Sequence, residues 1–385
     1  MFKLFGDKII WTVSILLLII SVLLIYSSGG SESIGTHITH LLMGLGLIFI
    51  FSRFNYRYFT NLSTILLTFS GVLLFFLILS PSYDGSIISN FKGRWIRMGI
   101  FSFQPSELAK YSLILFLCRN LVMYKQEILK FSHLFLYILF PTILIFFLVF
   151  PFNLSTALLI FFIAFFLIFI SGYPIKLFFK YILIPTFILF GFFFSLLIVN
   201  PPESSLSFLP RLTTWKNRIC LEEFKQPPLS WVDCSAYDST KIYSNNYQID
   251  KALGAINRGG IIGKGAGKSF YKKLLPDSTS DFVFAIFLEE YGFVGGVGIL
   301  FLYLLFYQRI LISGIYSIDE FPRLLLFGLG SVVVFQALLH MSVSVNILPV
   351  TGQTLPLVSK GGSSVWVTSL ALGIILNITH QIKNQ

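Results

Sequence analysis

Charged side chains are scarce in this chain of 385 residues, because Asp, Glu, Lys and Arg together make up only 12% of it. Soluble domains carry about 25% charged residues, so the composition argues against a soluble enzyme. Cysteine is also rare, with three residues, which excludes a fold built on disulfides. Hydrophobic residues, in contrast, reach 55%. The sequence therefore predicts a protein whose solvent is mostly lipid.

Apolar stretches recur along the chain, and each is close to the roughly 20 residues that a helix needs to cross a bilayer. Because lipid offers no water to backbone groups, the fold class is expected to be an all-α integral membrane protein. The ten expected transmembrane helices are 9–27, 37–54, 62–80, 106–123, 133–150, 154–171, 177–199, 282–310, 323–345 and 363–380. One membrane domain, residues 1–385, would contain one long loop, residues 200–280, between helices 7 and 8.

The distribution of Lys and Arg predicts the orientation. With the N-terminus in the cytoplasm, the inside segments hold 12 of these residues and the short outside loops hold 4. Another 11 lie in the loop 200–280, which is too long for the rule to count. We therefore expect both termini in the cytoplasm and an extracytoplasmic long loop. The net charge of +11 fits anionic lipid headgroups rather than nucleic acid.

Charges within predicted spans are costly and mark candidate functional residues. Glu107 and Lys110 are three residues apart and share one helix face. They could form an ion pair that only neutralises both charges, or Lys110 could also face a polar cavity and contact an anionic ligand. Glu289 and Glu290 lie about 12–14 Å along the eighth helix from Asp281, and at least one should point into the bundle.

Asp281 stands at the expected outer start of the eighth helix. In one interpretation, Ser280 or Asp281 is simply the N-cap of that helix. In the other, Asp281 is a general base held at the membrane surface. A helix N-terminus favours an ionised carboxylate, whereas an efficient base needs a pKa nearer the working pH, so burial would have to offset the helix dipole.

Three further segments are polar where the chain meets the outer surface. The glycine-rich segment 259–269 lacks the spacing of a nucleotide-binding loop, so it is either a flexible surface loop or a backbone nest for an anion. Ser363 and Ser364 open the tenth helix and could cap it or donate to a headgroup. The irregular stretch 349–356 predicts a wet cavity nearby.

The long loop is too long to be a mere connector, and turn-rich sequence is expected through Asn245-Asn246. Cys220 and Cys234 share this loop and could form a disulfide, whereas Cys118 is expected to be a free packing residue. The histidines show no metal-ligand spacing, and no metal ligand is assigned.

Several motifs in order along nearly the whole chain resemble the FtsW/RodA family, whose members are named for shape, elongation, division and sporulation. The similarity rests on Gly93-Arg94-Trp95-Ile96, Phe103 through Lys110, Tyr247-Gln248 through Gly259-Gly260, Leu275-Pro276 through Asp281-Phe282, Glu289-Glu290-Tyr291-Gly292, and Leu348 through Ser364. The segments Gly6 through Trp11 and Arg211 through Arg218 are most similar to cell-division members of the Bacteroidetes type.

The resemblance implies an inverting peptidoglycan glycosyltransferase of the inner membrane that polymerises lipid II into β-1,4 glycan during septal synthesis. Asp281 would deprotonate the acceptor hydroxyl, while Lys110 and Arg94 would stabilise the pyrophosphate leaving group. The candidate substrate-binding residues are Arg94, Trp95, Glu107, Lys110, Gln248, Gln353, Ser359, Gly361, Gly362 and Ser363. A divalent cation, Mg or Mn, could assist. The implied partners are a class B penicillin-binding protein and other divisome membrane proteins, without nucleic acid.

The sequence departs from the family pattern at three positions. Asn153 stands where an Asp is usual, Thr279 where a His is usual, and Lys360 where a Tyr is common. Three alternative functions also stay open: a transporter or flippase for lipid II, a non-catalytic divisome scaffold, and a polymerase of the elongation branch.

Overall fold

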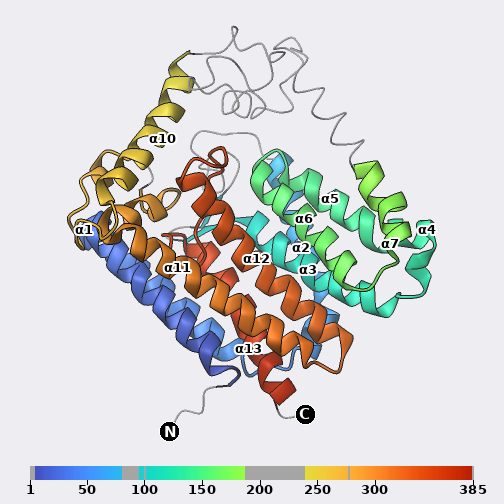
Figure 1. Ribbon diagram of the computed structural model, residues 1–385. Coiled ribbons are helices and arrows are strands. Elements are labelled where there is room, and N and C mark those ends of the chain that lie inside the picture. The colour runs from blue at the N-terminus through green and yellow to red at the C-terminus, as the bar shows by residue number, and fades with distance from the viewer. Residues whose placement is uncertain (1–4, 80–94, 99–100, 187–238, 276–277, 384–385) are drawn as a thin grey trace.

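The computed structural model describes residues 5–79, 95–98, 101–186, 239–275 and 278–383, and it is helical apart from one short β-hairpin (Figure 1). The elements are α1 (Lys8–Phe51), α2 (Arg57–Leu79), β1 (Ile96–Met98), β2 (Phe101–Phe103), α3 (Pro105–Met123), η1 (Glu127–Leu129), α4 (Phe131–Leu134), η2 (Phe135–Leu139), α5 (Phe140–Val149), α6 (Leu154–Ile170), α7 (Ile175–Phe178), η3 (Phe179–Leu183), α10 (Ser239–Gly259), η5 (Tyr271–Lys273), α11 (Val283–Ile315), α12 (Glu320–Ser344) and α13 (Gly362–Lys383).

Helix α1 is a hairpin of two spans rather than one long rod. The Ser21 hydroxyl and the His37 ring nitrogen Nε2 lie 2.8 Å apart, although 16 residues separate them. A straight helix would hold these residues about 24 Å apart, so the chain reverses between them. The two spans, Lys8–Ser27 and Ile34–Phe51, agree with the first two predicted helices.

The two chain termini meet at one end of the bundle (Figure 1). The Asp7 amide donates to Thr379 Oγ1 at 3.1 Å, and Arg309 Nη2 lies 2.5 Å from Asp7 Oδ2. We call this the terminal end. Helices α11 and α13 begin at the opposite end, which we call the site end.

Seven helical segments of the described residues are long and apolar enough to cross a membrane. They are Lys8–Ser27, Ile34–Phe51, Arg57–Leu79, Phe131–Val149, Val283–Ile315, Glu320–Ser344 and Gly362–Lys383. Two more predicted spans are helices as well: α6 has 17 residues, and α3 has 19 and carries Glu107, Lys110 and Arg119. The remaining predicted span, 177–199, is helical through residue 186, and the rest of it lies outside the described residues. The all-α membrane class is confirmed.

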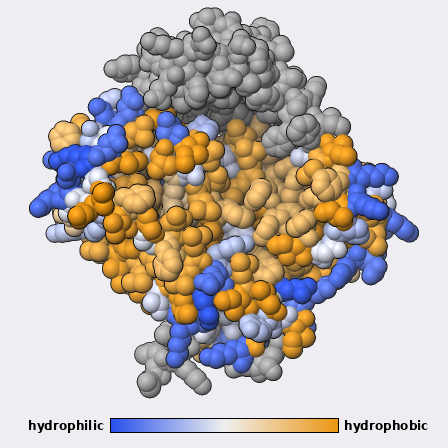
Figure 2. Space-filling model, viewed as in Figure 1, coloured by the Kyte–Doolittle hydropathy of each residue, from blue (hydrophilic) through white to orange (hydrophobic). Residues whose placement is uncertain are grey.

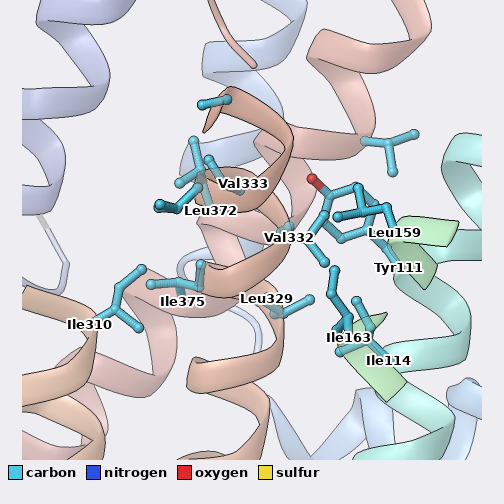
Figure 3. Packing of buried hydrophobic residues seen from close by; sticks show 14 of the residues in the cluster. Tyr111, Ile114, Leu159, Ile163, Ile310, Leu329, Val332, Val333, Leu372 and Ile375 are labelled. Carbon is cyan, nitrogen blue, oxygen red and sulfur yellow. The ribbon is translucent and has the colours of Figure 1, made fainter. Parts of the chain in front are cut away.

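The core of the bundle is built on α12 and α13. Their apolar windows are each 83% buried inside the protein, whereas that of α2 is 22% buried and faces outward. In Figure 3, Val332 and Leu329 of α12 lie between Ile114 and Ile163 on one side and Ile375 on the other. The face in Figure 2 is largely hydrophobic across its middle, with hydrophilic residues gathered toward its edges, as a lipid-facing surface requires.

A proline within a span is accommodated by a neighbouring helix. Pro141 has no N–H to donate to the carbonyl of Tyr137, four residues earlier. The Asn120 side chain of α3 supplies a donor instead, with Nδ2 3.0 Å from that carbonyl oxygen. The helix passes through a π-helical turn at Phe135–Leu139, the usual consequence of such a disturbance.

The long loop contains a helix that the sequence analysis missed. Helix α10 runs through Asn245 and Asn246, so the prediction of turn-rich sequence there is wrong. Ile249 and Ala252 recur at helical spacing, and both are buried in an apolar cluster with Phe282 and Val343. This apolar stripe outweighs the turn preference of the asparagines and packs α10 against α11.

Candidate functional site

Asp281 lies in a turn at the site end, directly before α11, and is partly exposed. The helix begins at Val283, with Phe282 in the N-cap position. The interpretation of Ser280 or Asp281 as the N-cap is therefore wrong. Phe282 is 1% exposed, and its burial against α10 determines where the helix starts. The Asp281 carboxylate thus stands one residue before the capping position.

Helix α11 is interrupted at Gly292, whose φ of 69° lies in the left-handed region. The loop 260–265 pairs with the backbone groups that the interruption frees. Lys264 and Gly265 donate to the carbonyls of Glu289 and Glu290 at 3.0 and 2.9 Å, while Phe293 and Val294 donate to the carbonyls of residues 260 and 261 at 2.9 and 3.1 Å. A Cβ at position 292 would come within 2.4 Å of loop backbone atoms, so this approach requires glycine.

This pairing overturns one interpretation of the glycine-rich segment and limits the other. The segment is not a flexible surface loop, because four backbone hydrogen bonds join it to α11. The amides of Lys264 and Gly265 are already used by carbonyls, so they cannot form the anion nest. Non-helical backbone within this predicted span is stable because the loop and the interrupted helix satisfy each other's hydrogen bonds.

Glu289 is fully buried and anchors the loop that precedes the Asp281 turn. Its Oε1 lies 2.6 Å from Arg258 Nη1 of α10 and accepts from the Phe270 amide at 2.9 Å. Its Oε2 accepts from the Ser269 hydroxyl and, at 3.2 Å, from the Tyr271 amide. One carboxylate therefore ties α10, the loop and α11 together.

Glu290 is 1% exposed and connects α11 to the reversal of α1. The Ser27 hydroxyl donates to Glu290 Oε1, and Lys272 Nζ donates to the Ser27 carbonyl at 2.6 Å. The prediction that at least one of the two adjacent glutamates points into the bundle is confirmed for both.

Glu107 and Lys110 form the predicted ion pair, with 2.9 Å between Lys110 Nζ and Glu107 Oε2. The Lys110 side chain is 0% exposed, and its ammonium also donates to Gln336 Oε1 at 2.6 Å. Gln336 Nε2 then donates to the carbonyl of Thr354 at 3.0 Å, and the Thr354 hydroxyl lies 3.0 Å from that of Ser364. A continuous polar network thus runs from α3 through α12 to the loop before α13.

Gln353, which precedes Thr354 of this network in the chain, is also buried. Its side-chain Nε2 donates to Thr156 Oγ1 at 3.0 Å, and its backbone carbonyl oxygen lies 2.8 Å from His340 Nδ1. Asn153, the departure from the family pattern, is the N-cap of α6 and accepts from the Thr156 amide at 3.3 Å. The contacts observed for Asn153 are therefore those of a helix cap.

The loop between α12 and α13, residues 345–361, joins this network to the Asp281 turn. The Ser359 hydroxyl donates to the Ser280 carbonyl at 2.7 Å, and the Lys360 amide donates to the Thr279 carbonyl at 2.9 Å. Ser363, at the start of α13, accepts from the Gln104 amide at 3.2 Å. Glu107 and Lys110 reach this loop through Gln336, whereas Gln353 and Ser359 lie in it and Ser363 follows it closely, so five of the predicted residues meet around one loop.

The other predicted residues are less tightly joined to this system. Gln248 is partly exposed on α10, next to Ile249 of the cluster that buries Phe282. Trp95 is partly exposed just before β1, while Arg94 lies outside the described residues. Gly361 immediately precedes α13 and Gly362 begins it, and a Cβ on Gly362 would come within 3.0 Å of the His40 ring. Cys220 and Cys234 also lie outside the described residues, and Cys118 is a buried free cysteine as predicted.

Sequence reasoning missed several polar residues of the site. Gln336 and His340 are four residues apart in the apolar helix α12, and polar residues within a span are a signal that could have been used. Arg258 and Ser269 gave no local signal, since they are 31 and 20 residues from Glu289. Within the described part of the chain, no group of three His, Cys, Asp or Glu residues could hold a metal.

A cavity of about 330 Å³ opens between α10, α11 and α12. Its lining includes Phe284, Leu288, Phe293, Met341 and Val345 and is almost entirely apolar. It therefore differs from the wet cavity that was predicted beside residues 349–356, and we assign it no role in the chemistry.

The fold and the buried polar system define a multi-pass membrane protein with a candidate site at one end of its helical bundle. A family model described as "Cell cycle protein", covering FtsW, RodA and SpoVE, matches residues 7–384. The chain belongs to this FtsW/RodA/SpoVE family.

Known relatives agree over nearly the whole chain. A "Probable peptidoglycan glycosyltransferase FtsW" of Buchnera aphidicola subsp. Baizongia pistaciae is 31% identical, over 99% of this chain and 95% of its own. "Stage V sporulation protein E" of Bacillus subtilis is 29% identical, over 97% of both chains.

Solved structures share the fold. The rod shape determining protein RodA of Thermus thermophilus aligns with a TM-score of 0.65 and 23% identity, over 99% of this chain and 98% of its own. A structure described as "Structural coordination of polymerization and crosslinking by a peptidoglycan synthase complex" aligns with a TM-score of 0.68 and 22% identity, over 99% of both chains.

Proposed function

We propose that this protein is a peptidoglycan glycosyltransferase that polymerises lipid II, with Asp281 as the general base. The family membership supports the reaction class, because the curated relatives include probable peptidoglycan glycosyltransferases. The single observation that carries the assignment of the base is the position of Asp281. It is a partly exposed carboxylate that does not occupy the N-cap, in a turn held by two hydrogen bonds from the loop before α13.

In the proposed reaction, the Asp281 carboxylate takes the proton from the acceptor sugar hydroxyl. The hydroxyl oxygen attacks the anomeric carbon of the donor, and the bond from that carbon to the pyrophosphate oxygen breaks with inversion. The pyrophosphate leaves with the electron pair. Positive charge near it would stabilise the transition state.

Lys110 does not contact the pyrophosphate directly in this proposal, because its ammonium is paired with Glu107 and bonded to Gln336; it orders the buried polar network behind the site. Arg94 and Trp95 would contact the headgroup directly, together with Gln248 and Gly362, whereas Gly361 and Ser363 are buried and would shape the site from behind them. Because no set of three metal-ligating residues lies in the described part of the chain, we derive no step through a divalent cation.

The orientation and partner belong to the same proposal. The Lys and Arg bias supports cytoplasmic termini, which would put the site end and Asp281 on the extracytoplasmic face. A membrane-anchored transpeptidase of the penicillin-binding class would cross-link the product, and the division branch is favoured by the relatives named FtsW. Depletion of a division polymerase would give filaments, whereas depletion of an elongation polymerase would give round cells.

The test is polymerisation of labelled lipid II by the purified protein together with its cognate transpeptidase. Asp281→Asn preserves size but cannot take a proton, so it should reduce polymer by at least about 10²-fold. The matched control is Asp250→Asn, which changes an exposed aspartate on α10 and should retain wild-type activity. Equal polymer from wild type and Asp281→Asn would remove Asp281 from catalysis. No polymer from either would favour a transporter or a scaffold, which a lipid translocation assay would then separate.

A further inference from the structure

We propose that Ser359 is a positioning residue that holds the Asp281 turn, and not a substrate contact. The inference rests on the proposed function, because it assigns Ser359 a part in the same reaction. It replaces the role in substrate binding that the sequence suggested for this serine.

The hydroxyl of Ser359 is committed within the protein. The residue is 1% exposed. Its Oγ accepts from the Leu355 amide at 2.8 Å and donates to the Ser280 carbonyl at 2.7 Å. A serine hydroxyl has one proton, so Ser359 has none left to donate to a sugar or a phosphate.

The bond to Ser280 is one of two hydrogen bonds that join neighbouring residues of the α12–α13 loop to neighbouring residues of the Asp281 turn. The Lys360 amide donates to the Thr279 carbonyl at 2.9 Å, next to the Ser359–Ser280 bond. The two bonds fix the position and the direction of the peptide that leads into Asp281. Because Asp281 directly follows Ser280, movement of this peptide would move the carboxylate.

The segment that provides these bonds is itself held rigidly. Leu357 has a φ of 63°, a left-handed conformation that is unfavourable for a non-glycine residue and persists only where the surroundings enforce it. On either side of Leu357, the Tyr303 hydroxyl donates to the Pro356 carbonyl at 2.5 Å and the Ser21 hydroxyl to the Val358 carbonyl at 2.7 Å. Helices α1 and α11 thus support the strained turn, and the turn supports Asp281.

The first test separates positioning from substrate binding by steady-state kinetics with lipid II. Ser359→Ala should lower kcat by about tenfold, since a small displacement of a catalytic group is costly, and should leave KM within about twofold of wild type. Ser359→Cys keeps the shape but replaces a strong donor with a weak one, so its kcat should fall between those of wild type and Ser359→Ala. The matched control is Ser344→Ala, a buried serine whose hydroxyl bonds only within α12 to the His340 carbonyl, and it should behave as wild type.

The second test does not need activity. Hydrogen–deuterium exchange of the peptide covering residues 278–286 should be several-fold faster in Ser359→Ala than in wild type, and unchanged in Ser344→Ala. An increase in KM at constant kcat would make Ser359 a substrate contact and overturn the proposal. Exchange and kinetics equal to those of Ser344→Ala would overturn it as well. Wild type that makes no polymer would refute the proposed reaction, while the exchange result would still decide whether Ser359 holds the turn.

Discussion

The strongest prediction for stability concerns the charge of Glu289. This carboxylate is 0% exposed and accepts two hydrogen bonds on each oxygen. Glu289→Gln keeps one acceptor oxygen but presents an amide N–H₂ to the other two donors. Two hydrogen bonds to a charged group, worth about 1.5–3 kcal/mol each, would be lost. The Ser269 hydroxyl can rotate to accept from the new amide, which recovers part of this loss. We therefore expect a destabilisation of about 3–5 kcal/mol.

Removal of the partner should cost less. The Arg258 side chain is 40% exposed, so solvent screens its ion pair, and Glu289 keeps three other donors in Arg258→Gln. We expect a loss of about 1 kcal/mol for that variant. In the expected order of stability, Glu289→Gln lies well below Arg258→Gln and wild type lies above both, because Glu289 is buried with four donors whereas Arg258 is partly exposed.

The assay combines denaturant unfolding in detergent with limited trypsin digestion. Lys264, Lys268 and Lys272 lie in the segment that Glu289 anchors, so Glu289→Gln should accelerate cleavage there. Cleavage elsewhere serves as the internal reference. If Glu289→Gln were no less stable than Arg258→Gln, and its loop equally resistant to trypsin, the assignment of this carboxylate as the anchor of the loop would be refuted.

Two further predictions concern other parts of the fold. Gly292→Ala should destabilise the protein by more than about 2 kcal/mol in the same unfolding assay, because it combines a left-handed φ with a Cβ 2.4 Å from backbone atoms. The control is Gly298→Ala, whose Cβ would meet nothing within 4 Å and which should not destabilise the protein. Burial raises the pKa of Asp7, but hydrogen bonds from Arg309 and from the first backbone amides of α1 outweigh it and lower the pKa below its ordinary value. The stabilisation by the Asp7 carboxylate is therefore present above the ordinary pKa of an aspartate and is lost as pH falls through its lowered pKa. Asp7→Asn should cost about 1–2 kcal/mol at pH 7 and nothing in strong acid. A pH-independent cost would contradict the role of the charge.

The positions of the membrane spans could be predicted because they depend on local apolar content. The Glu107–Lys110 pair could be predicted for the same kind of reason, since three residues of helix bring the two side chains together. The partner of Lys110 beyond this pair could not, because Gln336 is 226 residues away in the chain. Contacts of that kind depend on how helices pack, and one sequence carries no direct record of them.

The interruption of α11 illustrates a second limit. A glycine within an apolar run is compatible with close helix packing, so the sequence around Gly292 does not by itself predict an interruption. Its left-handed conformation depends on the backbone of residues 260–265, which the chain places about 30 residues earlier. Helix α10 is different, because Ile249, Ala252 and Ile256 recur at helical spacing and predict an amphipathic helix once periodicity is weighed above turn residues.

Protein contacts, and not the length of a membrane span, determine the position of Asp281. The part of α11 before Gly292, residues 283–291, is only about 13 Å long, too short to span a bilayer. Its position therefore cannot follow from a match between helix length and bilayer thickness. It follows from Glu289, from the two hydrogen bonds of the α12–α13 loop and from the burial of Phe282 against α10. A carboxylate held by protein contacts keeps its place relative to the rest of the site when the surrounding lipid changes thickness, which is what the proposed role of Asp281 as a base would require.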